Sequence, residues 1–252
     1  MMQKSAFRLD GKRAFVTGAG RGIGRAVAIA LAQEGAFVTF CARSRNELEE
    51  AVSEVIGAGG QADLCVADVT DVSTFAKAVA AQAPYDVFVN NAGMNRPKPM
   101  VDVSEDDFDA VIGLNLRAAY FAAQTMVRSM LGAGIQGSII NISSQMGHVG
   151  AANRSLYCAS KWAIEGMTKA LAVELGPSRI RVNTICPTFV ETPMTKPFLD
   201  DPAFKESVLS KIKLGRLAQL SDVVGAAVFL ASEASLMMTG SAILLDGGWT
   251  AD

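Results

Sequence analysis

Short apolar runs alternate with longer segments of helical spacing along almost the whole chain, and this alternation constrains the fold more than any other feature. The runs are four to six residues long and are mostly bounded by Gly, Asn, Asp or Ser, which is typical of buried strands. They predict strands at Arg13–Thr17, Phe37–Cys41, Gln61–Val66, Val87–Asn90, Ser138–Ile142, Arg181–Ile185 and Ala242–Leu245.

The segments between these runs have apolar residues three or four positions apart, which indicates amphipathic helices. Strands that alternate with helices form βαβ units, and such units build a parallel sheet covered on both faces. The 252 residues are therefore expected to form one doubly wound α/β domain, spanning 1–252, with about seven strands. The expected helices are Gly22–Glu34, Arg45–Gly57, Val72–Ala81, Glu105–Met130, Ser155–Leu175 and Ser221–Ala231.

The segment 187–213 is the least regular part of the chain and contains four prolines. In a compact α/β domain, a long irregular insertion near the carboxyl ends of strands is often a lid over a binding site. A plain surface excursion explains the same composition, so both interpretations stay open.

Charge and residue usage exclude several classes of protein. The formal net charge of −2 provides no basic field for nucleic acid or an anionic membrane. His148 is the single histidine, and no two of the four cysteines form a Cys-x-x-Cys pair, so no metal site or disulfide framework is expected. The amino terminus does not resemble a signal peptide, and no apolar run reaches about 18 residues, which favours a cytoplasmic protein.

A glycine-rich turn, T-G-x-x-x-G-x-G at Thr17–Gly24, joins the first expected strand to the first helix. Glycines allow the backbone to approach a pyrophosphate, whose charge is favoured by free N–H groups at a helix N-terminus. The strict G-x-G-x-x-G fingerprint is absent, and so is the P-loop pattern G-x-x-x-x-G-K-[ST]. The turn alone is compatible with a dinucleotide site or with a tight turn that binds nothing.

The end of the second strand bears on the choice of dinucleotide. An acidic side chain there would bind the ribose 2′-hydroxyl of NAD, whereas this chain has Ala42 followed by Arg43. Arginine is suited to pair with a 2′-phosphate, and Arg21 adds a second cation, so NADP(H) is favoured over NAD(H). Arg43 could also be a solvated residue that opens the next helix.

Polar residues gather in three places against the apolar background: Asn90–Gly93 after the fourth strand, Asn115 within an apolar helix, and Ser143-Ser144 after the fifth strand. Tyr157 and Lys161 follow at positions i and i+4, which places them on one helical face. Each feature has a structural explanation when taken alone, but chance does not readily explain why all of them occur in this order and at these distances.

In this order, with N-N-A-G at Asn90–Gly93, Y-x-x-x-K at Tyr157–Lys161 and a closing Asp246-Gly247-Gly248, the chain resembles the classical short-chain dehydrogenase/reductase family over nearly its whole length. The enoyl-reducing branch has Y-x-x-x-M-x-K instead. The resemblance implies a Rossmann-type fold and hydride transfer between a nicotinamide cofactor and a ketone or secondary alcohol. It also implies a catalytic tetrad of Asn115, Ser144, Tyr157 and Lys161.

The resemblance gives each member of this tetrad a role. Tyr157 is expected to be the general acid/base, with its pKa lowered from about 10 by Lys161 and the oxidised nicotinamide ring. Ser144 would hold the substrate oxygen, and Lys161 would also bind the nicotinamide ribose. Asn115 would hold a water molecule that links Lys161 to solvent.

The family's cofactor contacts fall on the glycine turn, on the ends of the second to fourth strands and on the start of the lid. One departure is Thr188, because the family commonly has Pro-Gly where this chain has Pro187-Thr188. The expected cofactor contacts are Gly18, Arg21, Gly22, Ile23, Gly24, Arg43, Asp68, Val69, Asn91, Ala92, Gly93, Tyr157, Lys161, Pro187, Val190 and Thr192.

The substrate is expected to meet several hydrogen-bonding groups, which suits a polyol, keto-sugar or hydroxy acid. A 3-oxoacyl-(acyl carrier protein) reductase is the alternative, and a non-catalytic nucleotide-binding sensor is a remote one. The resemblance further implies a homotetramer formed through Glu105–Met130 and Ser155–Leu175. The substrate contacts are expected to be Asn95, Ser144, Gln145, Arg154 and Thr188, with Arg96, His148, Asn153, Phe198 and Phe204 nearby.

Overall fold

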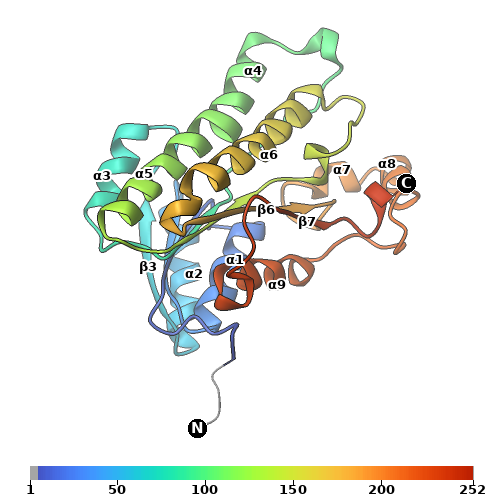
Figure 1. Ribbon diagram of the computed structural model, residues 1–252. Helices are drawn as coiled ribbons and strands as arrows, with labels where there is room; N and C mark the ends of the chain where they lie inside the picture. Colours follow the sequence, from blue (N-terminus) through green and yellow to red (C-terminus); the bar gives the residue numbers. More distant parts are fainter. Residues whose placement is uncertain (1–4, 252) are drawn as a thin grey trace.

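A computed structural model describes residues 5–251, and its centre is one seven-stranded sheet (Figure 1). Every neighbouring pair of strands is parallel, in the order β3-β2-β1-β4-β5-β6-β7. The predicted doubly wound architecture is confirmed. The strands are β1 (Arg13–Thr17), β2 (Phe37–Ala42), β3 (Gln61–Val66), β4 (Val87–Asn90), β5 (Ser138–Ile142), β6 (Arg181–Pro187) and β7 (Ala242–Leu245). Residues 1–4, which belong to the segment expected not to be a signal peptide, and residue 252 lie outside the described part.

Helices cover both faces of the sheet (Figure 1). One apolar core lies beneath α1 (Gly22–Gln33), α2 (Arg45–Gly57) and α9 (Leu220–Ala231). The other core lies beneath α3 (Val72–Ala80), α5 (Ala119–Gly132) and α6 (Ser155–Leu175). The helix α4 (Glu105–Ile112) precedes α5 and contacts α6. Within residues 5–251, no helix is both long enough and apolar enough to cross a bilayer.

Side-chain caps explain why several helices begin where they do. Ser44 accepts a hydrogen bond from the Glu47 N–H at the start of α2, and Ser104 with Asp107 forms a capping box at the start of α4. The strands β1 and β4 to β6 are almost wholly buried, as expected of a parallel sheet with helices on both faces.

The expected single helix Glu105–Met130 is divided in the structure. A π-helical segment, Gly113–Ala118, separates α4 from α5, and Asn115 lies within it. Apolar periodicity cannot reveal one extra residue in a helical turn, so the sequence predicted one continuous helix across this segment. Such π-helical segments occur often at functional sites.

The segment 187–213 is more regular than predicted. It contains α7 (Lys196–Leu199) and α8 (Pro202–Leu209), which lie beside the sheet at the end of β6 and β7 (Figure 1). The prolines misled the prediction because Pro197 and Pro202 occupy the first turn of each helix, where the missing N–H has no partner to lose.

Candidate active site

The four predicted catalytic side chains come from the loop after β5, from α6 and from the π-helical segment that packs on α6. Ser144 follows β5, Tyr157 and Lys161 occupy the first two turns of α6, and Asn115 lies in the π-helical segment that packs on α6. Asn115, Ser144 and Lys161 are all buried. Buried polar groups need hydrogen-bond partners, so the partners of each residue show what it can do.

Lys161 is held against the end of β5. Its Nζ donates a hydrogen bond to the Ile142 carbonyl at 2.9 Å and lies 5.6 Å from the centre of the Tyr157 ring. Burial lowers the pKa of Lys161 from 10.5 to about 8, although the neighbouring Cys186 and Glu165 favour its charged form. Near neutral pH this ammonium is therefore charged but readily loses its proton.

The pKa of Tyr157 is shifted upward, whereas a downward shift was expected. Burial raises the pKa of Tyr157 above its ordinary value, while hydrogen bonding with Ser144 and the charge of Arg154 lower it in part. Lys161, which was expected to lower this pKa, is not among the groups that do so. Its ammonium is directed at the Ile142 carbonyl instead.

Both amide protons of Asn115 are engaged in hydrogen bonds. Its Nδ2 donates to the Met94 carbonyl at 2.8 Å and to the Ser160 hydroxyl at 3.1 Å, and its Oδ1 accepts from the Met94 N–H at 2.8 Å. A water molecule would therefore have to bind through an oxygen lone pair, because both amide protons are taken. A Cβ on Gly93 would lie 3.3 Å from the Asn115 Oδ1 and 3.9 Å from the Lys161 Nζ, which places the N-N-A-G loop beside the tetrad.

The glycine turn forms an open backbone cradle at the start of α1. Gly18 and Gly22 have φ angles of +64° and +59°, which strongly favour glycine. Asn91 fastens this turn to the N-N-A-G loop, since its Nδ2 donates to the Thr17 carbonyl at 2.9 Å and the Gly18 carbonyl at 3.2 Å. A Cβ on Gly18 would lie only 2.8 Å from the same Nδ2, so the two loops pack too closely for a side chain. The arrangement suits a pyrophosphate at the helix N-terminus.

Two exposed arginines lie beside this cradle. The side chain of Arg43 is 81% exposed, and its Nη1 lies 3.7 Å from the Asp68 carboxylate. Arg21 is 72% exposed and lies 3.9 Å from Glu47. Burial would raise the pKa of Asp68, but hydrogen bonds from Thr70 and the charge of Arg43 outweigh it and lower that pKa. Both arginines are free to reorient toward a phosphate.

The start of the 187–213 segment faces the glycine turn. The Thr192 Cγ2 would lie 3.8 Å from a Cβ on Gly22, and Val190 is buried and pairs with Ala218 in a β-bridge. The glycine turn after β1, the N-N-A-G loop after β4 and the start of this segment therefore lie next to one another.

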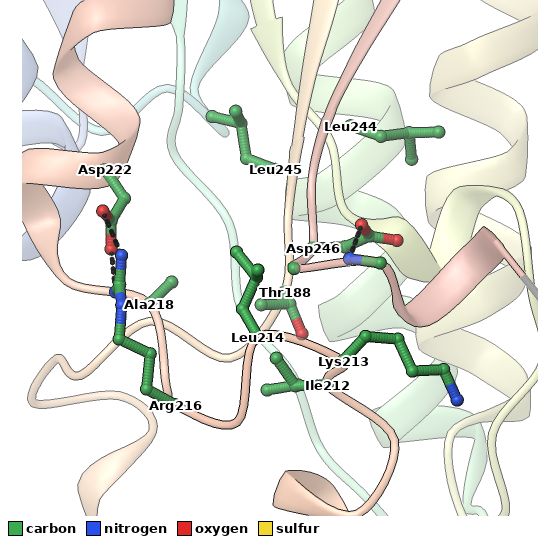
Figure 2. A pocket seen from close by; sticks show the side chains of 12 residues that line it. Thr188, Ile212, Lys213, Leu214, Arg216, Ala218, Asp222, Leu244, Leu245 and Asp246 are labelled. Atoms are coloured by element: carbon green, nitrogen blue, oxygen red, sulfur yellow. Dashed lines mark hydrogen bonds and ion pairs between the residues drawn. The ribbon is translucent and has the colours of Figure 1, made fainter.

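Thr188 faces a different space. Figure 2 shows a cavity of about 500 Å³ that is lined by Thr188, by residues of 212–222 and by residues 244–248. None of the tetrad residues lines this cavity, and the Arg216–Asp222 ion pair lies on its wall. The Thr188 N–H donates to the Leu245 carbonyl at 3.0 Å, which ties the residue to the edge strand β7.

The remaining predicted substrate residues include buried polar atoms without partners. Gln145 is 1% exposed, and neither its Oε1 nor its Nε2 has a hydrogen-bond partner among the described residues. The Asn95 Oδ1 and the Thr188 Oγ1 are likewise unpartnered in the described structure. Such atoms are rare in folded proteins, and a water molecule or a polar ligand would satisfy them.

Two further neighbours are engaged within the protein. Arg96 forms ion pairs with Asp106 at 2.6 Å and with Asp107 at 3.2 Å. Asn153 adopts a φ of +60°, and its carbonyl accepts a hydrogen bond from the Lys98 N–H at 3.0 Å. The Arg96 side chain is therefore not a leading candidate for a substrate contact, and the backbone of Asn153 is fixed by the Lys98 N–H.

A buried acidic cluster escaped the sequence analysis. Glu165 accepts hydrogen bonds from the Thr184 hydroxyl at 3.0 Å and the Cys186 thiol at 3.3 Å, and the His148 Nε2 lies 3.7 Å away. Burial, together with the charge of Glu165, raises the pKa of Cys186 to about 12. The available signal was helical spacing, because Glu165 follows Lys161 by four residues on the same face of α6.

Comparisons with known proteins extend over nearly the whole chain. A family model described as enoyl-(acyl carrier protein) reductase matches residues 18–250. The chain is 40% identical over 244 residues to an L-xylulose reductase of Bos taurus, covering 97% of this chain and 98% of the relative. It is 41% identical over 245 residues to a 3-oxoacyl-(acyl carrier protein) reductase of Thermotoga maritima, covering 96% of this chain and 98% of the relative.

A solved structure agrees with these relatives. A putative 2-deoxy-D-gluconate 3-dehydrogenase from Agrobacterium tumefaciens with bound NADP superposes with a TM-score of 0.94 at 36% identity. The match covers 99% of this chain and 100% of that chain. Each of the three proteins is named as an oxidoreductase.

Proposed function

The chain belongs to the classical short-chain dehydrogenase/reductase family, and from its site we infer an enzyme that interconverts a secondary alcohol and a ketone of a small polar molecule. The observation that carries this proposal is the hydrogen bond between Ser144 and Tyr157, with the Lys161 Nζ 5.6 Å from the centre of the Tyr157 ring and the unpartnered amide of Gln145 next to Ser144 in the chain. A polyol, a keto-sugar or a hydroxy acid would supply hydroxyl groups for those atoms.

The chain's own residues account for the proton transfer. In the reducing direction, the Tyr157 hydroxyl donates its proton to the carbonyl oxygen, and in the oxidising direction the phenolate accepts the alcohol proton. Ser144, which hydrogen bonds Tyr157, is placed to bind the same substrate oxygen. The charge of Arg154 and the hydrogen bond with Ser144 favour the phenolate when the proton has left. The nicotinamide, when bound, supplies or accepts the hydride.

We propose NADP(H) as the preferred cofactor. The cradle formed by Gly18, Gly22 and Gly24 would hold the pyrophosphate, and the exposed Arg43 would pair with the 2′-phosphate. The relative from A. tumefaciens binds NADP, which supports this choice. The other proposed contacts are Arg21, Ile23, Asp68, Val69, Asn91, Ala92, Gly93, Tyr157, Lys161, Pro187, Val190 and Thr192.

The proposal also covers the organisation of the molecule. The whole chain would act as one domain, with 187–213 closing over the substrate. The enzyme would form a homotetramer in the cytoplasm, where its four free cysteines would stay reduced. Exposed apolar side chains on α5 and α6 support the assembly.

A second candidate is reduction of a 3-oxoacyl thioester, because the relative from Thermotoga maritima has that activity in its name. A carrier protein is acidic, and its reductase needs a basic docking surface. Reduction of acetoacetyl thioesters with an efficiency above that for any polyol or sugar acid would favour this candidate.

Replacement of Tyr157 by Phe tests the proposed reaction. The variant removes the hydroxyl that moves the proton, so turnover is expected to fall about 1,000-fold or more, while NADPH still binds. Tyr120→Phe is the matched control, because Tyr120 is 45% exposed on α5 and should keep full activity. Measurable turnover near the unmodified rate in Tyr157→Phe would contradict the assignment.

A further inference from the structure

Arg154 is a buried cation without an acceptor. It is 8% exposed and precedes Tyr157 by three residues at the start of α6. Its guanidinium carbon lies 5.5 Å, 5.4 Å and 5.7 Å from the ring centres of Phe189, Phe198 and Phe204. Among the residues that the structure describes, no carboxylate or carbonyl accepts a hydrogen bond from it. Aromatic faces attract a cation but cannot accept its five N–H groups fully.

The other comparably buried arginine of the described chain, Arg181, has hydrogen-bond acceptors within the protein. Arg181 is 9% exposed, and its guanidinium donates to the Leu230 carbonyl at 2.7 Å and the Ser232 carbonyl at 3.4 Å. Burial lowers the pKa of both arginines, but only Arg181 has its donors satisfied within the protein. Its donors are therefore available to an acceptor from outside the described residues, such as water or the carboxylate of a ligand.

The rings around Arg154 are themselves held in place. Phe189 packs edge-on against Phe204 at 5.7 Å and stacks on Trp249 at 6.0 Å, and these rings adjoin an apolar cluster around Leu199 and Val208. A guanidinium between such rings keeps a defined orientation, as a specific binding group requires.

The same residue lies beside the reacting group. The charge of Arg154 lowers the pKa of Tyr157. The loop that bears Asn95 is also close, because the Lys98 N–H donates a hydrogen bond at 3.0 Å to the carbonyl of Asn153, the residue before Arg154. Gln145, next to Ser144, has both amide atoms unpartnered. Ser144 and Arg154 thus act directly on the Tyr157 phenol, and Gln145 follows Ser144 in the chain.

We propose that the substrate has a carboxylate that Arg154 binds, so that the enzyme acts on polyhydroxylated acids, such as aldonates and their keto acids, rather than on neutral alditols and ketoses. This inference rests on the proposed function and narrows it. A guanidinium binds a carboxylate through two parallel N–H···O bonds. No second cation is among the groups that affect Arg154, so its single charge matches a carboxylate better than a phosphate ester of nearly two charges.

The carboxylate is unchanged in the reaction. A secondary alcohol of the aldonate loses a hydride to NADP⁺ and a proton to Tyr157, which gives a ketone, NADPH and one proton. The reverse reaction consumes the same three species, so atoms and electrons balance. Arg154 holds one end of the molecule while Ser144 and Tyr157 act on a hydroxyl of the chain.

Substrate pairs that differ only at C1 test the proposal. D-Gluconate and D-glucitol, D-galactonate and D-galactitol, and D-mannonate and D-mannitol would be compared with NADP⁺ by the rate of NADPH formation. At least one aldonate is expected to have a kcat/KM about 100-fold above that of its alditol. Arg154→Leu should abolish this preference, mainly through KM, and Arg154→Lys should restore part of it.

Two controls separate recognition from other effects. Arg128→Leu makes the same chemical change at an exposed position near the end of α5 and should leave the preference intact. Melting temperatures with NADPH bound show which variants are folded. If Arg154 only adjusts Tyr157 or only holds the lid, Arg154→Leu reduces kcat/KM equally for both members of each pair, which overturns the proposal.

Binding provides a readout that does not depend on turnover. Tartrate and threitol differ only in their carboxylates, and their effect on the fluorescence of bound NADPH reports their affinity. Tartrate should bind the unmodified enzyme and Tyr157→Phe, and should bind about 100-fold more weakly to Arg154→Leu. Equal affinity for tartrate and threitol, or a preference for a sugar 6-phosphate over every aldonate, would overturn the proposal. Absence of turnover with every pair would count against the proposed function, while the tartrate series still tests Arg154.

Discussion

At the scale of single residues, the pKa values of the site depend on two opposing effects, burial and nearby charge. Burial shifts the pKa of Tyr157 upward and the pKa of Lys161 downward, so both groups are pushed toward their neutral forms. Ser144 and Arg154 act in the opposite direction on Tyr157. The proton therefore moves between groups whose charged forms depend on a few named neighbours.

Lys161 should leave a signature in the pH dependence of stability. The pKa of its folded form is about 8, below the ordinary 10.5, so between these values the unfolded chain holds more protons and stability rises with pH. Removal of this group in Lys161→Met should abolish a gain of the order of 3 kcal/mol between pH 8 and pH 10.5. Thermal unfolding of both proteins across this range measures the difference.

Lys169→Met is the control for that experiment, because Lys169 is an exposed residue of the same helix. Its stability curve should run parallel to that of the unmodified protein. Parallel curves for Lys161→Met as well would show that Lys161 is not destabilised by burial.

Arg43 should decide the choice of cofactor. Replacement by Asp removes the cation proposed for the 2′-phosphate and adds an acceptor for the ribose hydroxyl of NAD. The ratio of kcat/KM for NADPH over NADH is expected to fall by about 100-fold, as two lost charge-assisted bonds would predict. Arg45→Asp, an exposed neighbour paired with Glu49, should leave the ratio within a few-fold of its original value. An unchanged ratio in Arg43→Asp would remove Arg43 from the cofactor site.

At the scale of elements, function depends on where regular structure is interrupted. The π-helical segment places Asn115 toward Met94 and Ser160, so one irregular turn connects the N-N-A-G loop to α6. The β1–α1 turn is an interruption of a second kind, because glycines with positive φ leave its backbone open to a ligand.

Gly24→Ala should damage this turn. A Cβ on Gly24 would fall against the Gly18 carbonyl oxygen and the Asn91 amide, too close for either to remain in place. Overpacking of this kind costs about 1–3 kcal/mol of stability, and NADPH affinity should fall about tenfold or more because the cradle moves. Fluorescence titration and thermal unfolding measure the two effects.

The matched control for Gly24→Ala is Gly225→Ala in the interior of α9. No atom lies within 4 Å of a Cβ at Gly225, so the substitution should stabilise the protein by about 0.5–1 kcal/mol and leave NADPH binding unchanged. Similar behaviour of the two variants would mean that Gly24 has no special role in the turn.

At the scale of the whole molecule, apolar side chains remain on the outer faces of the helices. Trp162 is 54% exposed and Val173 is 82% exposed on α6, while Leu131 is 47% exposed on α5. These exposed apolar groups are the surface through which the proposed homotetramer would form. The edge strand β7 also exposes Leu244, which offers a second surface.

The proposed homotetramer predicts a mass of about 106 kDa, four times 26.5 kDa, by light scattering. Trp162→Glu places a charge on the exposed face of α6 and should shift the protein to a smaller species. Lys77→Glu, on the exposed surface of α3, should keep the assembly. A monomer of the unmodified chain would exclude this assembly.

The sequence was sufficient for the order of strands and helices along the chain, because periodicity is a local property of one element. Five of the seven strands have the predicted bounds, and the other two extend one or two residues further. The π-helical segment and the helices α7 and α8 could not be predicted, since helix type and length there depend on packing between distant segments.

The partners of the charged side chains could not be predicted from the sequence either. The sequence predicted Arg154 as a substrate contact and Arg96 as a residue nearby, and the fold gives Arg96 two acidic partners but surrounds Arg154 with phenyl rings. Which cation stays free for a ligand depends on residues brought together from different elements.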